Sequence, residues 1–282
     1  MDVWRGYADI VRGTPAQRLT RLERLLIKRP HLITKRLIAR YADALNGHKE
    51  FGRFNGPNRN SMLHPHTLLL LRLFGLASQA QAVEIGPYVG GSSIAIASGL
   101  RERGGQPLIS IEHGGRGVEL GGIYSTHPQL PSRDIIADLK RNIVAAGFES
   151  SVEIIEGRSD DPRVVSTLRH RVQGTIDLVV IDADGEVARD LAMLKPWLAP
   201  GCLLVIDDYA APGNPQKQEL IRQFIDGQVA CGTLEPLTIS GWGTWFGRLP
   251  LTRGARTLDM LGSLATWLAA RALEKPRRSA RV

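Results

Sequence analysis

The chain has 282 residues, of which 43% are hydrophobic, so it can bury one large core with room for appended segments. No apolar run approaches the roughly 18 residues that a membrane span needs. The start, Met1 to Arg5, lacks a basic region followed by an apolar one, so we expect neither an integral membrane span nor a secretory signal. Cys202 and Cys231 both stand in apolar sequence, which favours a reduced cytoplasmic protein without disulfides or a cysteine metal site.

The net charge of +8 is concentrated at the two ends of the chain. Residues 1–60 hold thirteen Lys and Arg against five Asp and Glu, and residues 251–282 hold seven against two, whereas the part between them holds sixteen against twenty-one. Basic ends can contact nucleic acid, anionic lipid or an acidic partner, but the solvated faces of amphipathic helices are the simpler explanation. We therefore do not expect a nucleic-acid partner.

The N-terminal part predicts helices followed by a loop. Residues 16–45 have apolar positions at helical spacing, and Pro30 separates two predicted helices, which would form a cap or pair with a second copy in a homo-oligomer. Residues 47–60 are rich in turn formers and predict a loop. At the other end, residues 257–273 predict an amphipathic helix before a basic tail, which packs on the protein or lies on an anionic membrane surface.

The middle of the chain alternates strands and helices, which predicts a doubly wound, mainly parallel α/β sheet covered on both faces, ending in an antiparallel hairpin. We predict three parts of the chain: a basic helical cap and loop at 1–60, the main domain at 61–250, and a basic helix and tail at 251–282. Ser132 is the predicted N-cap of the helix after a long glycine-rich loop at 114–131. The predicted strands are 82–85, 107–111, 152–155, 176–181 and 203–206, the hairpin is 237–249, and the predicted helices are 68–76, 133–146, 162–171 and 187–198.

The first strand runs into the segment Gly86-Pro87-Tyr88-Val89-Gly90-Gly91-Ser92, which predicts a tight turn and a helix N-terminus. Glycine lets the backbone approach a ligand, and the free N–H groups of the helix favour a carboxylate or a phosphate. The spacing does not give G-x-G-x-x-G, so nicotinamide or flavin binding is disfavoured. The segment therefore predicts a site for an anionic group of some other ligand.

Acidic residues follow several of the predicted strands. Glu112 ends the second strand, where a carboxylate can accept both hydroxyls of a ribose. Asp182 follows one strand and Asp207 and Asp208 follow the next, so the three side chains should meet at one edge of the sheet. Three carboxylates repel one another unless a cation neutralises them, and oxygen ligands favour Mg²⁺ or Mn²⁺ over zinc. Helix caps or salt bridges are the alternative roles.

With these motifs, residues 61–249 resemble the class I S-adenosylmethionine-dependent methyltransferases, and within them the metal-dependent O-methyltransferases of the catechol, caffeoyl-coenzyme A and macrocin-type sugar kinds. Val83 to Ser92 is similar to the first motif of that family, and Ile181 to Asp184 and Val205 to Asp208 are similar to its two metal-binding strand ends. The resemblance implies Asp182, Asp207 and Asp208 as metal ligands. The residues that it implies for S-adenosylmethionine are Met62, Glu84, Gly86, Tyr88, Gly90, Ser92, Glu112, Ser159, Asp160 and Asp182.

The sequence departs from that family at Gly185, where many relatives carry Lys or His three residues after the metal-binding aspartate. The proton acceptor would then be Asp182, His113 or a residue of the N-terminal loop. The resemblance implies a Mg²⁺-assisted methyl transfer to one of two neighbouring hydroxyls of a small acceptor such as a sugar, a polyphenol or a natural product. Two alternatives remain open: a methyltransferase acting on RNA or protein, and a binding or scaffold protein without turnover.

A pair of histidines and a pair of tryptophans could each have either a structural role or a role in ligand binding. His64 and His66 flank a proline before a helix, which indicates a loop and helix cap more than a metal site. Trp242 and Trp245 stand in the predicted hairpin, where tryptophan belongs to the core more often than it lines an acceptor pocket.

Overall fold

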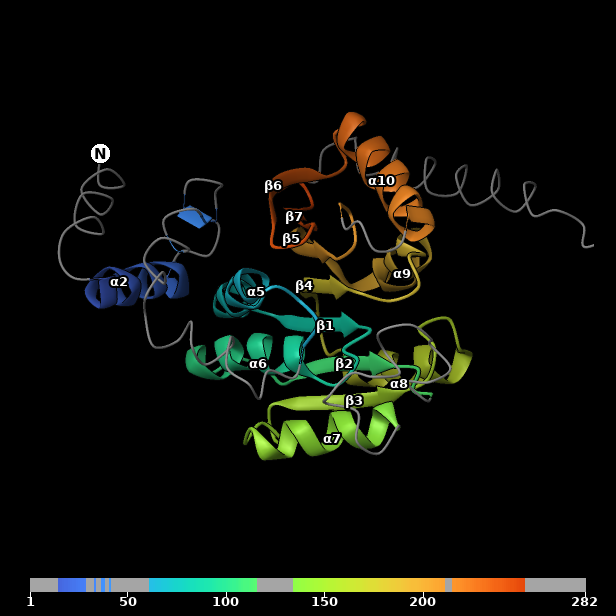
Figure 1. Ribbon diagram of the computed structural model, residues 1–282, viewed down its shortest axis with the longest axis horizontal. Coiled ribbons are helices and arrows are strands. Elements are labelled where there is room, and N and C mark those ends of the chain that lie inside the picture. Colours follow the sequence, from blue (N-terminus) through green and yellow to red (C-terminus); the bar gives the residue numbers. More distant parts are fainter. Residues whose placement is uncertain are drawn as a thin grey trace, which may run out of the picture.

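The computed structural model contains one mixed sheet with helices on both faces (Figure 1). A helix near the N-terminus, α2 (Pro15–Lys28), precedes this α/β body. The described residues are 15–28, 33, 37–38, 41, 61–115, 134–210 and 215–251. The elements of the body are α5 (Pro65–Ala77), β1 (Gln81–Ile85), α6 (Gly91–Arg103), β2 (Leu108–Glu112), α7 (Ile135–Ala145), β3 (Val152–Glu156), α8 (Pro162–Arg171), β4 (Ile176–Ile181), α9 (Val187–Leu194), the 3-10 turn η3 (Lys195–Trp197), β5 (Leu198–Ile206), α10 (Pro215–Ala230), β6 (Glu235–Ser240) and β7 (Thr244–Arg248).

The seven strands lie in the order β3-β2-β1-β4-β5-β7-β6. Strands β1 to β5 are parallel to one another, β7 runs antiparallel to β5, and β6 pairs antiparallel with β7. The chain order reverses between β1 and β4, and this switch point is where open α/β sheets bind ligands. The predicted parallel sheet with a terminal antiparallel hairpin is confirmed.

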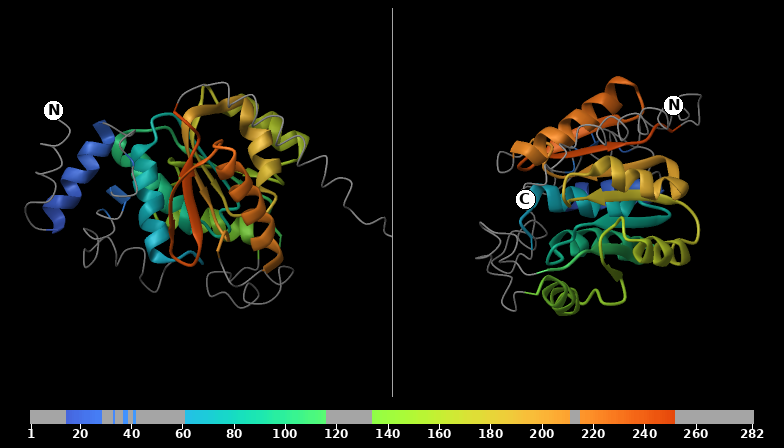
Figure 2. Two further views of the ribbon diagram at one scale, coloured as in Figure 1. Left: turned by 90° about the horizontal axis from the view of Figure 1, so that it is seen from above. Right: turned by 90° about the vertical axis from the view of Figure 1, so that its right-hand side faces the viewer.

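Side chains on each strand alternate between two hydrophobic clusters, one on each face of the sheet. On β4, Leu178 and Val180 belong to the cluster that includes residues of α5, α6 and α7. Val179 and Ile181 belong to the cluster that includes residues of α8, α9 and α10. Figure 2 shows the resulting helix, sheet and helix layers from two further directions. Burial on both faces explains why these strands are continuous apolar runs in the sequence.

Several predicted bounds agree with the structure, and others differ, among them the start of β5, which is Leu198 rather than 203. The strand 176–181 and the helix 162–171 have the predicted bounds. The predicted N-cap Ser132 is wrong: Asp134 caps α7, and its carboxylate accepts a hydrogen bond from the amide of Ala137 at 3.1 Å. Helix α9 ends at Leu194 rather than 198, because Pro196 follows within a 3-10 turn and β5 begins at Leu198. The sequence analysis did not predict α10.

Polar side chains also hold the fold together away from the strand ends that carry the predicted site. Asp177, near the start of β4, accepts hydrogen bonds from the hydroxyl of Ser78 (2.6 Å) and the amides of Gln79 and Ala80. These contacts fasten the turn between α5 and β1 to the amino end of β4. On α5, the guanidinium of Arg72 is buried against Glu23 of α2 and donates to the Tyr41 hydroxyl at 3.0 Å. The N-terminal helix is therefore anchored to the body by charge as well as by apolar packing.

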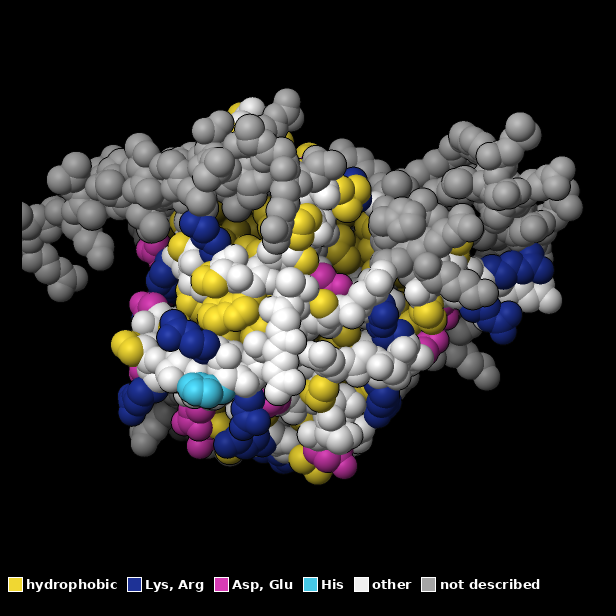
Figure 3. All heavy atoms as spheres, turned by 180° about the vertical axis from the view of Figure 1, so that it is seen from behind, with side chains coloured by type: hydrophobic (Ala, Val, Ile, Leu, Met, Phe, Trp, Pro, Cys, Tyr) yellow, Lys and Arg dark blue, Asp and Glu magenta, His cyan; other side chains and the backbone are white. Residues whose placement is uncertain are grey.

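Some sequence predictions fall outside the described residues. These are the break at Pro30, most of the loops 47–60 and 114–131, and the helix and tail at 251–282 apart from Leu251. Of the two cysteines, Cys202 is buried, but Cys231 is exposed, contrary to the apolar setting that its sequence indicates. None of the described helices is long and apolar enough to cross a membrane. On the face in Figure 3, basic and acidic side chains of the described residues are interspersed.

Candidate active site

The ends of β4 and β5 bring Asp182 and Asp207 side by side. Ile181 pairs with Ile206 in register, and each aspartate is the next residue on its strand. The ladder continues one step further, because the amide of Asp182 donates to the Ile85 carbonyl at 2.9 Å and the amide of Asp207 donates to the Ile181 carbonyl at 3.0 Å. The backbone therefore fixes both aspartates at the carboxyl edge of the sheet, beside the switch point.

Asp208 completes a cluster of three carboxylates. One oxygen each from Asp182, Asp207 and Asp208 lies within 4.8 Å of the others, and all three residues are partly exposed. Asp208 has φ of +59°, a left-handed conformation that aspartate tolerates better than most residues. Oxygen donors of this kind and number suit Mg²⁺ or Mn²⁺. The expectation that these three residues meet agrees with the structure, and the type and number of their oxygen donors suit a divalent cation.

The environment of the cluster disfavours negative charge. Burial raises the pKa of Asp207 to about 7, with a further contribution from Asp182, although the Thr244 hydroxyl donates to the Asp207 carboxylate. Burial also raises the pKa of Asp182, and Asp208 acts in the same direction. The cluster therefore gains stability from any cation that reaches it.

A cation that the sequence analysis did not predict already contacts this cluster. Lys217 extends from the first turn of α10, and its Nζ lies 2.5 Å from Oδ2 of Asp208 and 3.4 Å from Oδ1 of Asp182. The attraction of these carboxylates raises the pKa of Lys217 despite its burial. No local motif could have revealed it, because Lys217 is far from Asp182 in the sequence and its helix was not predicted.

The turn after β1 lies directly beside the aspartates. The amide of Gly86 donates to the Ile111 carbonyl at 3.0 Å. Gly86 has φ of +85°, and a Cβ at this position would lie 2.1 Å from the Asp182 carbonyl oxygen, so the close approach of two strand ends requires glycine. Gly90, also with positive φ, precedes α6, whose first turn contains the buried Ser92. The predicted arrangement of strand, tight turn and helix N-terminus is present here.

Glu112 connects the turns that follow β1 and β2. Its Oε2 accepts a hydrogen bond from the amide of Tyr88, and its Oε1 accepts one from the amide of Gly114, both at 2.9 Å. Tyr88 has φ of +54°, so two non-glycine residues with positive φ, Tyr88 and Asp208, are found at this edge of the sheet. Burial raises the pKa of Glu112, while these amides favour the charged form. A carboxylate has lone pairs for further donors, so ribose hydroxyls remain chemically possible partners.

Glu84 is buried between β1, α6 and β2. Its Oε2 accepts hydrogen bonds from the hydroxyls of Ser93 and Ser110 at 2.5 and 2.9 Å, and its Oε1 has no hydrogen-bond partner among the described residues. Only 1% of Glu84 is exposed, and burial raises its pKa. Its carboxyl group therefore supports the turn and helix from within the protein.

The remaining candidates for cofactor contacts lie around this edge. Ser159 is buried, and its hydroxyl donates to Asp190 at 2.6 Å, whereas the Asp160 carboxylate accepts from the exposed Arg158 at 3.0 Å. Met62 is partly exposed just before α5. His113 is exposed after β2, and β1 separates β2 from the strand that carries Asp182.

The hairpin closes the other side of the aspartate cluster. Trp245 is 2% exposed and packs in the core, whereas Trp242 is 56% exposed in the hairpin turn. The ring of Trp242 lies 5.4 Å from that of His64, edge to face. His64 caps α5 by accepting a hydrogen bond from the His66 amide, so the predicted cap role is present. The two tryptophans thus differ: one is a core residue, and the other is available to a ligand.

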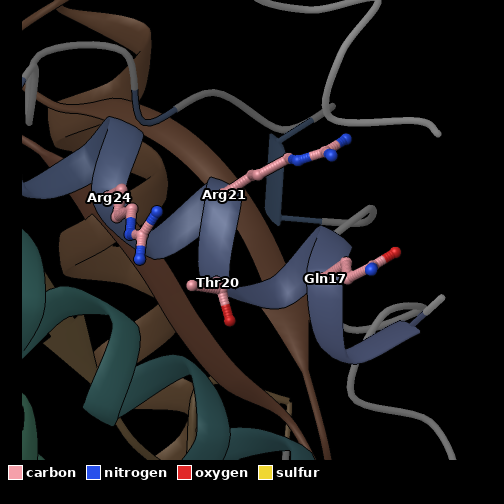
Figure 4. Close-up of a pocket in the computed structure, with 4 residues that line it drawn as sticks. All are labelled: Gln17, Thr20, Arg21 and Arg24. Carbon is pink, nitrogen blue, oxygen red and sulfur yellow. The ribbon is translucent and has the colours of Figure 1, made fainter. Parts of the chain in front are cut away.

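A separate hollow of about 260 Å³ lies along α2, where Gln17, Thr20, Arg21 and Arg24 line it (Figure 4). In Figure 1, α2 lies at the left, whereas the arrows of β1 to β4 point to the right. This hollow is thus at the opposite end of the molecule from the carboxylates, and nothing in it matches their chemistry.

Comparison with known proteins agrees with this geometry. Residues 83–209 match a family model described as a methyltransferase domain, a range that runs from β1 to just beyond β5. The matched range is 127 of the 282 residues, and this segment of the chain is similar to methyltransferase domains. The matched range includes the glycine-rich turn, Glu112 and all three aspartates, but not α10 with Lys217. A search of curated protein sequences finds no match.

Solved structures support the same fold for this chain. The O-methyltransferase TomG from Streptomyces achromogenes, in complex with SAM, is 21% identical, with 74% of this chain and 89% of TomG covered and a TM-score of 0.51. Cofactor-bound Rv0187 from MTB is 20% identical, with 75% and 91% covered and a TM-score of 0.51. At these identities the similarity establishes a shared fold, and the acceptor has to be argued from the site itself.

Proposed function

We propose that this methyltransferase transfers the methyl group of S-adenosylmethionine to a hydroxyl oxygen of a small polyhydroxylated acceptor, with the aid of a divalent cation. The observation that carries the proposal is the convergence of Asp182, Asp207 and Asp208 within 4.8 Å, at the edge where the methyltransferase motif also ends. A sugar, a polyphenol or a natural product with neighbouring hydroxyls would present the matching oxygen pair. TomG, which is described as an O-methyltransferase of tomaymycin synthesis, is consistent with this class.

The three aspartates would hold Mg²⁺ or Mn²⁺. When bound, such an ion lowers the pKa of an acceptor hydroxyl and fixes its position. The chain contributes the rest of the arrangement: Thr244 orients the Asp207 carboxylate by donating to it, and the backbone ladder fixes Asp182 and Asp207. Methyl transfer needs the acceptor oxygen in line with the sulfonium, so this rigidity accounts for much of the proposed rate enhancement.

The turn after β1 and the end of β2 would hold S-adenosylmethionine. In this proposal Glu112 accepts the ribose hydroxyls, the first turn of α6 receives the carboxylate of the methionine moiety, and Met62, Tyr88, Ser159 and Asp160 border the ligand. Support comes from Gly86 and Gly90, which have positive φ and no side chain that would obstruct the turn. Glu84 acts indirectly, by holding Ser93 of α6.

Asp182 is the proposed proton acceptor, because burial raises its pKa toward the range in which a carboxylate can take up a proton. His113 is the second candidate, although β1 separates its strand from that of Asp182. Trp242 would flank the acceptor, since it is exposed beside the hairpin strand that carries Thr244. The basic segments 1–60 and 251–282 are proposed as a cap and tail outside the reaction, with homo-oligomer contacts through the N-terminal helices.

The first test is calorimetric titration with S-adenosylhomocysteine in the presence of Mg²⁺. We expect micromolar binding, about −8 kcal/mol. A panel of vicinal diols and their mono-O-methyl controls should then identify acceptors through the formation of S-adenosylhomocysteine. Folded protein that does not bind S-adenosylhomocysteine would contradict the proposal. Turnover that favours an amine or a protein side chain over every diol would exclude only the acceptor class.

A further inference from the structure

Lys217 is positioned by the aspartate cluster rather than by its own helix. It is the third residue of α10, and a lysine in the first turn of a helix is disfavoured by the positive end of the helix dipole. Its side chain is nevertheless only 14% exposed and reaches Asp208 at 2.5 Å and Asp182 at 3.4 Å. The ion pairs with these two carboxylates offset the unfavourable helix position.

Gly185 makes room for this lysine. It has φ of +90°, and a Cβ at position 185 would lie 2.9 Å from Cγ of Lys217. Any other residue there would press against the aliphatic part of the lysine side chain. The resemblance implies Lys or His at position 185, but this chain has glycine there. The side chain of Lys217, which comes from α10, passes next to this glycine instead.

The ammonium group binds two of the three carboxylates that a metal ion would need. Oδ1 of Asp182 and Oδ2 of Asp208 accept from Lys217, while Oδ1 of Asp207 accepts from Thr244. Mg²⁺ and Mn²⁺ bind carboxylate oxygens at about 2.1 Å. An ammonium 2.5 Å from Oδ2 of Asp208 and a divalent ion on the same oxygen would repel each other across a few ångströms.

We propose that the ammonium group of Lys217 is the resident cation of the aspartate site, and that a divalent ion enters the site by displacing it. The inference rests on the proposed function insofar as it assigns the aspartates to a metal. The new element is that the Lys217 ammonium group and a divalent ion compete for the same carboxylates. With lysine in place part of the negative charge of the three carboxylates is offset and the fold needs no metal, whereas metal binding requires the lysine side chain to move away.

The test is a Mn²⁺ titration followed by the electron paramagnetic resonance signal of free Mn²⁺, which needs no acceptor. Lys217→Met keeps the aliphatic length and removes the charge, and it should bind Mn²⁺ about 10- to 100-fold more tightly than wild type, since ion pairs no longer have to be broken. Lys217→Arg should stay as weak as wild type. The matched control is Lys195→Met, which removes an exposed lysine just before β5, at the amino end of the strand. It should leave the Mn²⁺ affinity within about twofold of wild type.

Thermal melting supplies a second measurement that does not depend on titration. The melting temperature of wild type should be unchanged by EDTA, whereas Lys217→Met should melt lower in EDTA and recover with Mn²⁺, because its carboxylates then lack a counter-charge. If Lys217→Met does not fold, Lys217→Gln takes its place in both measurements.

Equal Mn²⁺ affinities of wild type and Lys217→Met would overturn the role of Lys217, and so would the absence of Mn²⁺ binding in both. S-adenosylhomocysteine binding is measured separately on the same samples. Its absence in wild type would overturn the proposed methyl transfer, whereas its presence without any Mn²⁺ binding would overturn the metal assignment and the competition together while leaving the methyltransferase intact.

Discussion

Two groups of carboxylates at neighbouring strands are stabilised in different ways. Around β1 and β2, Glu84 and Glu112 accept hydrogen bonds from neutral hydroxyl and amide donors. At the ends of β4 and β5, the aspartates face one another and a lysine. Neutral donors hold the first group in a fixed geometry, which suits a cofactor platform. The second group has excess negative charge, which suits a site that recruits and exchanges cations.

The sharpest test of this contrast is Asp182→Asn, which removes one charge from the aspartate group and keeps the side-chain shape. We expect methyl transfer to fall about 100-fold or more, because both the proposed metal site and the proposed proton acceptor are lost. The formation of S-adenosylhomocysteine with the best diol of the panel measures it. S-adenosylhomocysteine affinity should stay within about threefold of wild type. A parallel loss of that affinity would mean that the two carboxylate groups do not act separately.

Glu112→Gln should produce the complementary effect. It weakens the charge-assisted bonds to the Tyr88 and Gly114 amides and the proposed bonds to the ribose, so S-adenosylhomocysteine binding should weaken about 10- to 100-fold. Calorimetry measures the change. Mn²⁺ affinity should remain that of wild type, and a matching fall in Mn²⁺ affinity would show that the glutamate and aspartate groups form one site.

Glu84→Gln tests whether the carboxyl group of Glu84, which is hydrogen-bonded to two serine hydroxyls, makes the stability of the protein depend on pH. Because burial raises the pKa of Glu84 in the folded protein, the folded state binds more protons than the unfolded state above the ordinary glutamate pKa of about 4.3. Its contribution to stability is therefore greatest below that pH and declines as the pH rises toward the folded pKa. Melting temperatures from pH 4 to 8 should fall less steeply in Glu84→Gln than in wild type. Parallel curves for the two proteins would contradict a raised pKa at this position.

The smallest effect is expected from Trp242→Ala, in the hairpin turn that precedes Thr244 and β7. Since the side chain is 56% exposed, stability should change by no more than about 0.5 kcal/mol. The KM for the acceptor should rise several-fold, with the S-adenosylhomocysteine affinity unchanged. Trp245→Ala is the matched comparison, because loss of this core side chain should cost about 3–5 kcal/mol in chemical denaturation. An unchanged acceptor KM in Trp242→Ala would remove this residue from the site.

The sequence predicted the sheet well because its signals are local. The apolar runs at 82–85 and 176–181 are buried strands, and the acids that follow them reach the same edge because parallel strands end together. Asp134 rather than Ser132 caps α7 because both residue types can cap a helix, and only three-dimensional context decides between them.

The parts that sequence reasoning missed depend on long-range contacts. The buried residues of α10, Ile221, Phe224, Ile225 and Gln228, do stand at helical spacing, but one of the four is polar and most other positions of the helix are polar too. Without that helix, the approach of Lys217 to Asp208 could not be predicted. The different settings of Trp242 and Trp245 likewise follow from the hairpin's register, in which Trp245 pairs with Ile206 of β5.

The fit between Gly185 and Lys217 also has a consequence for the history of the protein. A long side chain at 185 would occupy the space through which Lys217 passes, and loss of Lys217 would leave the aspartates without their internal counter-charge. The two positions therefore cannot change independently. Among related sequences, a glycine at the position of 185 should accompany a basic residue at the position of 217, and the pair should be gained or lost together.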